Sequence, residues 1–465
     1  MYGDRALPSG IGSAAVPEEV RSIAARLREA GGQAWVVGGA VRDSILGREV
    51  RDWDLSTDLH PERIQSLFPH TVSVGAHFGT IVVVGREDEY EVTTFREDLG
   101  YSDGRHPDSV RYSTRPEDDL ARRDFTVNAL AFDPETNVLL DPFGGLADLA
   151  ARVLRTVGPP HERFGEDALR ILRAVRLSAQ RGFTIEWETL RAVVQLAPTL
   201  PRVSAERIAA EMERVLGSEH AGAGLELLHE TGLLARILPE LVQCYGVAQN
   251  PHHAYDVFYH TLAAVDGAEP EDRIVRWAAL FHDVGKPETR VLGEHTATFY
   301  SHQIRSEQHV RRALGRLRFS TEDRSAVAHL VRQHMFHYTP DWTDGAVRRF
   351  LRTVGPEQVR DLYRLRAADT RGNGKRTRIA PELAELAERI ERILASDAAL
   401  SVADLAVGGH ELMDRFGRPP GKWIGAVLQA LLEEVLEDPS LNEPDILLAR
   451  AETVLALSEA TETGD

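Results

Sequence analysis

The chain has 465 residues, 43% of them hydrophobic, which is enough for about three domains with real cores. No apolar run approaches the roughly 20 residues of a membrane span, and the first twenty residues lack a signal-peptide pattern, so we expect a cytoplasmic protein with no membrane partner. The single cysteine, Cys244, excludes an internal disulfide and a cysteine-based zinc site.

The formal net charge of −18 opposes RNA binding, because contacts to phosphate usually dominate the affinity of RNA-binding proteins. Arginines nevertheless gather in residues 152–181 and 305–318, while acids gather near the C-terminus. A basic strip on an acidic body would still attract RNA. The alternative is that these arginines only solvate amphipathic helices.

The first predicted elements lead into a glycine turn. Residues 17–30 carry leucine, isoleucine and alanine at helical spacing and predict a helix. Residues 34–37 are mostly β-branched or aromatic and predict a strand that ends at Gly38 and Gly39. A helix over residues 41–46 should follow.

A pair of acids follows this helix in the sequence RDWDLST. Alternation along a second predicted strand places Asp52 and Asp54 on one face. Two such carboxylates repel each other unless a cation lies between them, and a hard divalent ion such as Mg²⁺ is the natural occupant. The amides of Gly38 and Gly39 can approach a phosphate closely, and Arg42 can bind the same oxygens. Together these features predict metal-dependent nucleotidyl transfer; the alternative is a glycine turn before a solvated acidic strand.

The rest of the N-terminal region predicts a small sheet. A short helix over residues 61–68 precedes strands over residues 71–74, 80–84 and 90–95. Glu91, on the third of these strands, is a candidate third carboxylate for the metal, or an ordinary solvated side chain. The polar residues 96–119 predict a mobile loop around a short strand.

Two further motifs carry charge at regular spacing. LARRDFTVNALAF, residues 120–132, predicts a helix on which Asp124 orients Arg123 through an ion pair. In FGEDALRILRAVR, residues 166–176 should be helical, with Asp167 and Arg170 on one face. A carboxylate beside a guanidinium can imitate the pairing edge of a base, so this pair predicts nucleotide selection without a template; an ordinary surface ion pair is the alternative.

A second centre is expected beyond residue 250. Imidazoles and carboxylates recur on predicted helices, and such ligands suit Mn²⁺, Fe, Ni or Zn²⁺. Adjacent His282 and Asp283 lie about 100° apart on a helix, so both can reach one ion. The predicted metal ligands are His260, His282, Asp283, His302, His334 and Asp369. The alternative is a helical domain that keeps its histidines for packing.

GGAVRD with RDWDLST, RRDFTVNA and EDALR resemble the motifs of the class II tRNA nucleotidyltransferase and bacterial poly(A) polymerase family, within the polymerase-β-like superfamily. The resemblance implies addition of nucleotides to RNA 3′ ends without a nucleic-acid template. It also implies that Arg123 binds the nucleotide phosphates, that Asn128 lies near the ribose, and that Arg173 and Arg176 contact phosphate or RNA. Residues 96–119 resemble the flexible loop that helps the family switch from C to A.

The sequence LFHDVGKPETR resembles an HD-type metal-dependent phosphohydrolase domain. It departs from that pattern at Gln303, where many relatives have Glu, so the support around His302 is expected to differ.

The resemblance covers nearly the whole chain and predicts an α+β protein: a small mixed or antiparallel sheet head of the polymerase-β type, followed by a helical neck, an HD domain and a helical tail. The expected boundaries are a flexible N-terminus and four regions, at residues 1–19, 20–158, 159–249, 250–375 and 376–465.

The expected function is CCA addition to the tRNA 3′ end with CTP and ATP, with Mg²⁺ on Asp52 and Asp54. Alternatives within the class are an A-adding or CC-adding enzyme or a poly(A) polymerase. A different-class alternative is an HD phosphohydrolase acting on nucleotides or RNA ends, and a third possibility is a non-catalytic RNA-binding module. Oligomeric state is left open.

Overall fold

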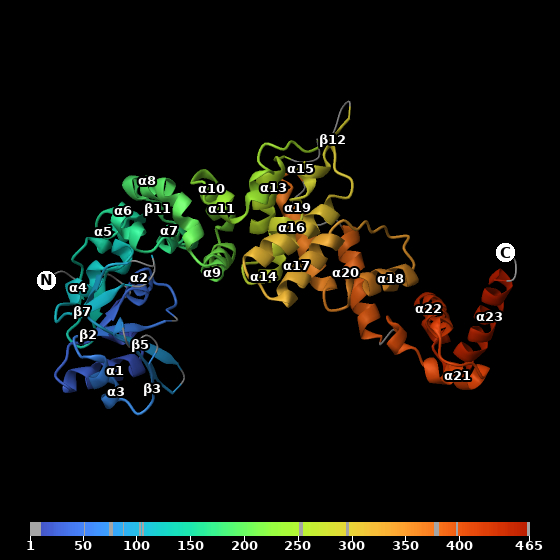
Figure 1. Cartoon of the computed structure of the whole chain (residues 1–465), viewed down its shortest axis with the longest axis horizontal. Coiled ribbons are helices and arrows are strands. Elements are labelled where there is room, and N and C mark those ends of the chain that lie inside the picture. Colours follow the sequence, from blue (N-terminus) through green and yellow to red (C-terminus); the bar gives the residue numbers. More distant parts are fainter. Residues whose placement is uncertain are drawn as a thin grey trace. The chain divides into compact units, whose positions relative to one another are not determined.

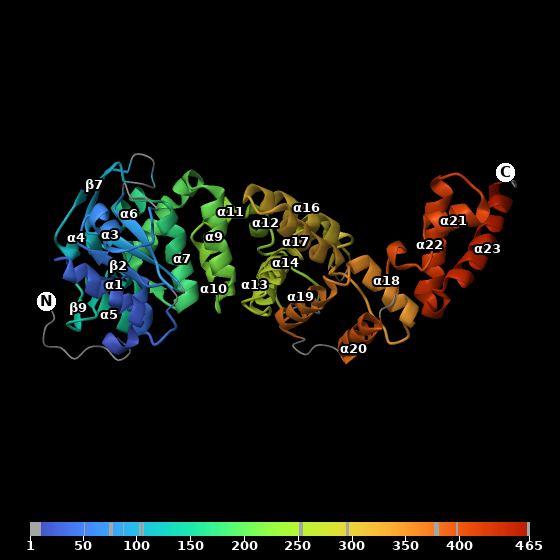
Figure 2. The same ribbon diagram turned by 90° about the horizontal axis from the view of Figure 1, so that it is seen from below.

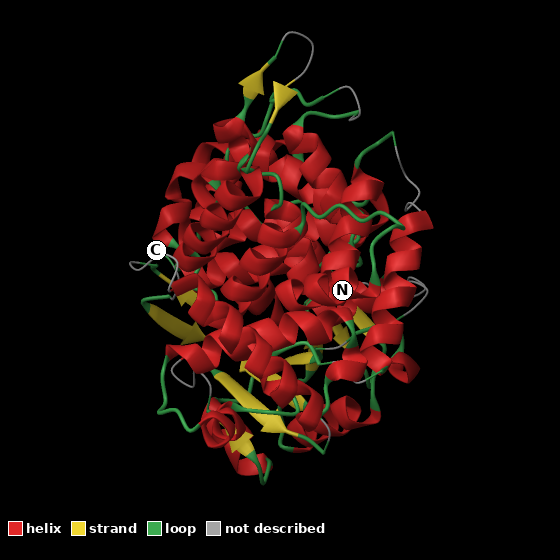
Figure 3. Cartoon of the chain, turned by 90° about the vertical axis from the view of Figure 1, so that its right-hand side faces the viewer, coloured by secondary structure: helices red, strands yellow, loops and turns green. Residues whose placement is uncertain are grey.

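The computed structural model describes residues 11–50, 52–73, 78–86, 88–101, 104, 107–250, 254–293, 297–375, 381–396 and 399–462. The chain divides into two compact units, Met1–Pro239 and Glu240–Asp465. In Figure 1 the first unit runs from blue to green and the second from yellow-green to red. The larger strands lie in the first unit, and helices make up most of the described chain (Figure 3). The predicted α+β class is confirmed.

The head of the first unit contains a mixed sheet. Among the described residues its seven strands lie in the order β3-β4-β5-β2-β1-β8-β9. The β2–β5 pair is parallel and the other pairs are antiparallel. The strands are β1 (Trp35–Val37), β2 (Asp54–Thr57), β3 (Thr71–Val72), β4 (Thr80–Val84), β5 (Glu89–Thr94), β8 (Ala131–Asp133) and β9 (Val138–Leu140).

Alternating burial along β5 explains how the sheet separates its faces. Tyr90, Val92 and Thr94 are buried, while Glu91 is exposed and Thr93 is half-buried on the opposite face. On the apolar side, α3 (Pro61–Leu67) packs against β4 and β5 and also contacts α1 (Glu18–Glu29), after the 3-10 turn η1 (Ser13–Ala15). The other face is therefore left for polar side chains.

Two predictions in this head were wrong in whole or in part. The short strand expected within residues 96–119 is present as β7 (Ser109–Tyr112), but the segment is more regular than a loop, because β6 (Arg96–Leu99) pairs antiparallel with this strand and α4 (Pro116–Ala121) follows. Residues 102, 103, 105 and 106 of this segment, and residue 74 of the predicted strand, lie outside the described residues. Residues 120–132 are not one helix: α4 ends, η3 (Thr126–Asn128) forms one turn, and β8 begins. Residues 129–132 are buried on every side, so sheet pairing prevails over helical spacing.

The remainder of the first unit is helical. The predicted helix over residues 166–176 is interrupted, because Asp167 is extended, with φ −148° and ψ 108°, between two helices. A two-stranded parallel sheet joins β10 (Val153–Leu154) to β11 (Thr184–Ile185). The helices are α5 (Gly145–Ala151), α6 (Pro160–Glu166), α7 (Leu169–Arg181), α8 (Trp187–Leu196), η4 (Ala197–Arg202), α9 (Ala205–Leu216), α10 (Ala221–Glu230) and α11 (Leu234–Ile237).

The second unit begins with five helices packed around one centre, α13 (Val257–Asp266), α14 (Arg273–Phe281), α16 (His302–Arg316), α17 (Thr321–Gln333) and α19 (Val359–Gly372). Figure 2 shows α16 and α17 side by side. Other elements join or flank these helices: α12 (Pro239–Val242), α15 (Lys286–Thr289), β12 (Val291–Leu292), β13 (Ala297–Thr298), α18 (Asp344–Val354) and α20 (Pro381–Ala395).

The C-terminal helices have a hydrophobic core of their own. Leu412, Leu431, Leu447 and Ala451 are buried together there. The elements are η5 (Val402–Asp404), α21 (Gly409–Phe416), α22 (Lys422–Glu437), η6 (Pro439–Leu441) and α23 (Pro444–Glu462). Of the helices described, none combines the length and hydrophobicity that crossing a membrane requires.

Candidate functional site

The glycine turn after β1 is built against an arginine. Gly38 has φ +74° and ψ −129°, and it precedes α2 (Gly39–Ile45), which begins two residues earlier than predicted. A Cβ on Gly38 would lie 2.5 Å from Nη1 of Arg123. The backbone conformation therefore favours glycine, and a side chain here would also displace the Arg123 guanidinium. Gly39 is less restricted, with Nη2 of Arg42 3.6 Å from the corresponding Cβ position.

Asp54 and Glu91 are brought together by the sheet. The parallel register pairs Leu55 with Val92, so the residues before them stand side by side on β2 and β5. Both line a pocket of about 230 Å³ on the polar face of the sheet. Burial, and then the charge of Glu91, raises the pKa of Asp54 to about 6; Arg123 opposes this and Asp52 adds to it.

Asp52 does not share a strand face with Asp54 as predicted. The strand β2 begins at Asp54, and Asp52 lies in the exposed segment before it. Its charge still raises the pKa of Asp54, so the two acids are electrostatic neighbours. Among the described residues, the groups of three or more ligand atoms within 4.8 Å of one another both lie in the second unit. Asp52, Asp54 and Glu91 are thus too widely spaced to form such a group of ligand atoms by themselves.

Arginines form the opposite wall of the same pocket, which is lined by Arg96, Arg122 and Arg123. Asp119 is buried and accepts hydrogen bonds from Arg122 at 2.7 Å and from Nη2 of Arg123 at 3.4 Å. Nε of Arg123 is buried without a hydrogen-bond partner among the described residues. The pocket therefore places carboxylates opposite guanidinium groups, an arrangement that suits a metal ion on one side and phosphates on the other.

The predicted pairing of Asp124 with Arg123 was wrong. Asp124 accepts hydrogen bonds from Nε of Arg173 at 2.8 Å and from Nδ2 of Asn128 at 2.9 Å. Burial disfavours the ionised form of Asp124, but Arg173, Asn128 and Arg170 together outweigh burial, and the pKa of Asp124 falls below its ordinary range. Asp124 thus links η3, which bears Asn128, to helix α7, which bears Arg173. Sequence spacing could not reveal this, since the two arginines are 50 positions apart.

Arg42 faces inward rather than toward the pocket. Its side chain is only 8% exposed, and the guanidinium donates to both carboxylate oxygens of Asp43, at 2.9 and 2.8 Å, and to Oδ1 of Asn128. Asp43 also accepts a hydrogen bond from Arg181 at 2.9 Å. The side chain of Arg42 therefore supports Asn128, while the backbone at Gly38 and Gly39 remains the part of the motif beside Arg123.

Asp167 and Arg170 have separate partners. Asp167 accepts from Nη2 of Arg207 at 2.6 Å, and Arg170 donates to Glu166 and to the carbonyl of Arg163. The interruption at Asp167 turns its carboxylate toward α9, where Arg207 lies. Arg207 is not among the predicted site residues; its position in a second charged segment after EDALR was the available signal.

The first arginine cluster is largely paired with acids. Arg176 donates to Glu211 at 2.6 Å and to Gln180 at 3.0 Å, and burial lowers its pKa despite the charge of Glu211. With Arg170 and Arg173 also paired, these side chains do not form a freely solvated basic strip in the described structure.

A second site gathers the histidines in the second unit. His260 lies on α13 and His282 directly follows α14; His302 begins α16, His334 follows α17, and Asp369 lies on α19. All six predicted ligands come together. Each histidine places Nδ1 near a backbone carbonyl oxygen, of Gly372, Ala279, Phe299 and Val331 respectively, at 2.7–3.2 Å. These contacts direct the four Nε2 atoms toward a common centre, as metal-binding histidines require.

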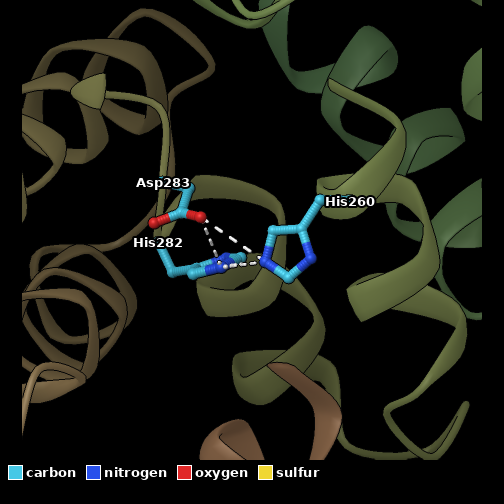
Figure 4. A group of neighbouring side chains, drawn as sticks. All are labelled: His260, His282 and Asp283. Atoms are coloured by element: carbon cyan, nitrogen blue, oxygen red, sulfur yellow. Dashed lines mark hydrogen bonds and ion pairs between the residues drawn. The ribbon is translucent and has the colours of Figure 1, made fainter. Parts of the chain in front are cut away.

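Asp283 lies between two sets of these ligands. One set is His260, His282 and Asp283, drawn in Figure 4, and the other is Asp283, His302 and His334; within each set the ligand atoms lie within 4.8 Å. Nε2 of His260 is 3.2 Å from Nε2 of His282 and 3.1 Å from Oδ1 of Asp369. Nitrogen atoms so close, beside buried carboxylates, suit a transition-metal ion.

The electrostatics of this centre also favour a cation. Burial opposes a charge on His282, but Asp283 outweighs it and raises the pKa of His282 above its ordinary value. Burial and the charge of His282 lower the pKa of His334 to about 3. Burial opposes ionisation of Asp283, yet His282 and Lys286 hold its pKa well below the usual range. The ionised carboxylate of Asp283 is therefore favoured among the imidazoles, an arrangement that suits a metal cation between them.

Comparisons with known proteins agree with both halves of the chain. Residues 34–155 match the model of the poly A polymerase head domain, residues 182–244 that of a probable RNA and SrmB-binding site of polymerase A, and residues 294–451 that of a putative tRNA nucleotidyltransferase domain 2. The CCA-adding enzyme of Geobacillus stearothermophilus is 36% identical over 432 residues, covering 93% of this chain and 96% of the relative. That of Enterococcus faecalis is 30% identical, covering 94% and 96%.

Solved structures show the same similarity. The Bacillus stearothermophilus CCA-adding enzyme in complex with CTP has a TM-score of 0.75 and 32% identity, and the match covers 96% of this chain and 98% of that one. The Thermotoga maritima enzyme complexed with tRNA has a TM-score of 0.54 at 20% identity, covering 94% of each chain, which shows a shared fold.

Proposed function

The chain belongs to the family of CCA-adding enzymes, as its motifs predicted, and from this premise we propose how its residues build the 3′ CCA end of tRNA. The protein is a template-independent tRNA nucleotidyltransferase, which uses CTP and ATP. Enzymes of this family use a divalent metal ion. The observation that carries the proposal is the pocket with Asp54 and Glu91 on one wall and Arg123 on the other.

Asp52 and Asp54 hold Mg²⁺, with Glu91 as the third carboxylate. When bound, the metal lowers the pKa of the terminal RNA hydroxyl and stabilises the charge on pyrophosphate. Arg123 binds the triphosphate over the turn at Gly38. The hydroxyl oxygen bonds to the α-phosphorus while the bond from that phosphorus to pyrophosphate breaks, so each cycle adds one nucleotide and releases one pyrophosphate.

The remaining nucleotide-site residues either contact the nucleotide directly or position the residues that do. Asn128 approaches the ribose, and Arg42 orients it through their hydrogen bond. Asp167 and Arg170 read the base, and the nucleotide competes with Arg207 and Glu166 for them. Arg173 and Arg176 support this region through Asp124 and Glu211, near the RNA end. A base that leaves these polar groups unpaired would be disfavoured by about 1–3 kcal/mol.

The proposed partners and regions follow from this activity. The head occupies residues 20–158, the neck 159–249, the histidine domain 250–375 and the tail 376–465. Because its substrates are tRNA and nucleoside triphosphates, the enzyme works in the cytoplasm.

One assay tests the transfer reaction and its extent. Purified protein receives tRNAs that end before the first C and after CC, and an unrelated RNA, with CTP, ATP, GTP or UTP and Mg²⁺. Addition of C, C and A to the first tRNA is expected, with no addition of G or U and little to the unrelated RNA. Addition of A alone, of CC alone, or of a long A tract would identify one of the alternative activities. Asp54→Asn should abolish incorporation, and full activity in that variant would contradict the assignment.

A second function rests on the histidine centre. The four converging Nε2 atoms and two carboxylates bind Mn²⁺, Fe, Ni or Zn²⁺, and the centre hydrolyses phosphate esters of nucleotides or RNA ends. Metal content of the purified protein, measured against Asp283→Asn, tests the binding. Release of inorganic phosphate or nucleotide from phosphate esters, lost in Asp283→Asn but kept in Asp54→Asn, tests the hydrolysis. Equal metal content in wild type and Asp283→Asn would contradict the proposed site.

A further inference from the structure

The histidine centre is closed on most sides and opens at one ligand. The side chains of His260, His282, Asp283, His302 and His334 are between 0 and 5% exposed. Asp369 is 19% exposed, and Arg366, one turn earlier on α19, is 31% exposed. Of the six residues at the centre, Asp369 is therefore the one most exposed to solvent, and Arg366 lies beside it.

The carboxylate of Asp369 faces two ways at this opening. Its Oδ1 lies 3.1 Å from Nε2 of His260, inside the centre, while its Oδ2 accepts a hydrogen bond from Nη1 of Arg366 at 3.1 Å. The guanidinium of Arg366 also lies 5.9 Å from the ring centre of Phe336, close enough for a cation–π contact. A guanidinium has five N–H donors, so the bond to Asp369 leaves donors for a second oxyanion.

Each of the two carboxylates at the centre has a cationic partner without a metal. Asp283 is paired with Lys286 at 2.5 Å, and Asp369 is paired with Arg366. Metal-binding histidines are neutral, so a divalent ion adds two positive charges that these pairs do not cancel. A dianion such as phosphate would restore the balance. Coordination of a cation by Oδ1 of Asp369 would also weaken the ion pair between this carboxylate and Arg366.

We propose that Arg366 binds a phosphate oxyanion at the mouth of the histidine centre, and that this binding requires the metal ion. The inference rests on the proposed metal site and names a residue beyond its ligands. The ligand class is inorganic phosphate or a phosphate monoester, bound with its oxygens toward both the ion and the guanidinium. Without the metal ion Arg366 pairs with Asp369; with the metal ion bound, Arg366 also binds the phosphate.

Calorimetry with Mn²⁺ and then inorganic phosphate tests this on the full-length chain. The chain carries Asp54→Asn to remove the head metal site, and a parallel titration of His282→Ala defines the heat that belongs to this centre. Loss of one charge-assisted hydrogen bond in Arg366→Gln is expected to weaken phosphate binding about tenfold to a hundredfold, with Mn²⁺ affinity kept within about threefold. Arg366→Lys, which keeps a cation, should recover part of the affinity.

Arg364→Gln is the matched control. Arg364 lies on the same helix, is 54% exposed, and pairs with Asp361 at 3.1 Å and Asp272 at 3.3 Å rather than with a ligand. This variant should bind phosphate as the parent does. Unchanged phosphate affinity in Arg366→Gln, a parallel loss of Mn²⁺ and phosphate binding, or equal phosphate binding without Mn²⁺ would overturn the role of Arg366. Absence of any Mn²⁺ heat assigned to this centre would instead overturn the metal site itself.

Discussion

Replacement of Gly38 by alanine tests the glycine turn most directly, because the structure separates two effects of the added methyl group. The first is backbone strain at φ +74° and ψ −129°, a region that side chains rarely adopt, which costs about 1–3 kcal/mol. The second is displacement of Arg123, since Nη1 lies 2.5 Å from the position of the new Cβ.

The second effect concerns catalysis rather than stability. Arg123 lines the pocket that also contains Asp54, and moving its guanidinium would weaken the contact with the triphosphate that we propose for it. A charge-assisted hydrogen bond is worth about 1.5–3 kcal/mol, so kcat/KM for CTP should fall about tenfold to a hundredfold. Steady-state incorporation into a tRNA that lacks its CCA end measures this effect, and urea unfolding measures the strain.

Gly47 provides the control at the other end of the same helix. It has φ +65°, and a Cβ there would meet no atom within 4 Å. Gly47→Ala should therefore cost about 1 kcal/mol of stability and leave kcat/KM within about threefold of wild type. Activity of Gly38→Ala close to that of wild type, or equal losses of activity in both variants, would refute the argument that Arg123 depends on this turn.

Three further outcomes follow from the buried charges. Between about pH 4 and 6 the raised pKa of Asp54 keeps a proton on the folded state that the unfolded state has lost. Without metal, the contribution of Asp54 to the free energy of unfolding therefore falls by up to about 3 kcal/mol as pH rises through that range. Denaturation of wild type and of Asp54→Asn across this range measures the fall, and a pH-independent difference between the two would contradict the raised pKa. Asp124→Asn leaves Arg173 without its carboxylate and should destabilise the protein by about 2–4 kcal/mol in urea, whereas a change below about 0.5 kcal/mol would mean that the pair is dispensable. Asp283→Asn should remove metal bound at the histidine centre while nucleotide incorporation stays within about twofold of wild type. Loss of incorporation in this variant would contradict the independence of the two sites.

Much of the chemistry could be predicted from local sequence because the motifs keep their reacting groups close along the chain. The strand over residues 80–84 was correct to its ends, since a run of β-branched residues has few alternatives. The six residues that gather at the histidine centre were predicted from their residue types and their spread over helices. GGAVRD, RRDFTVNA and EDALR were sufficient to identify the family.

The pairing of charges was decided only by the tertiary structure. Asp124 meets Arg173 and Asp167 meets Arg207, although sequence proximity suggested Arg123 and Arg170 as their partners. The side chain of Arg42, which was predicted to bind phosphate, instead turns inward to Asn128. Likewise, parallel pairing of β2 with β5 sets Asp54 beside Glu91, and burial then raises the pKa of Asp54.

The sequence by itself thus determined which chemical groups the protein carries and the class of reaction they serve. Which carboxylate faces which guanidinium depended on strand register, on the interruption at Asp167 and on burial of residues 129–132 from all sides. The physical reason is that hydrogen bonds and ion pairs act over a few ångströms in space, and only packing brings distant segments within that range.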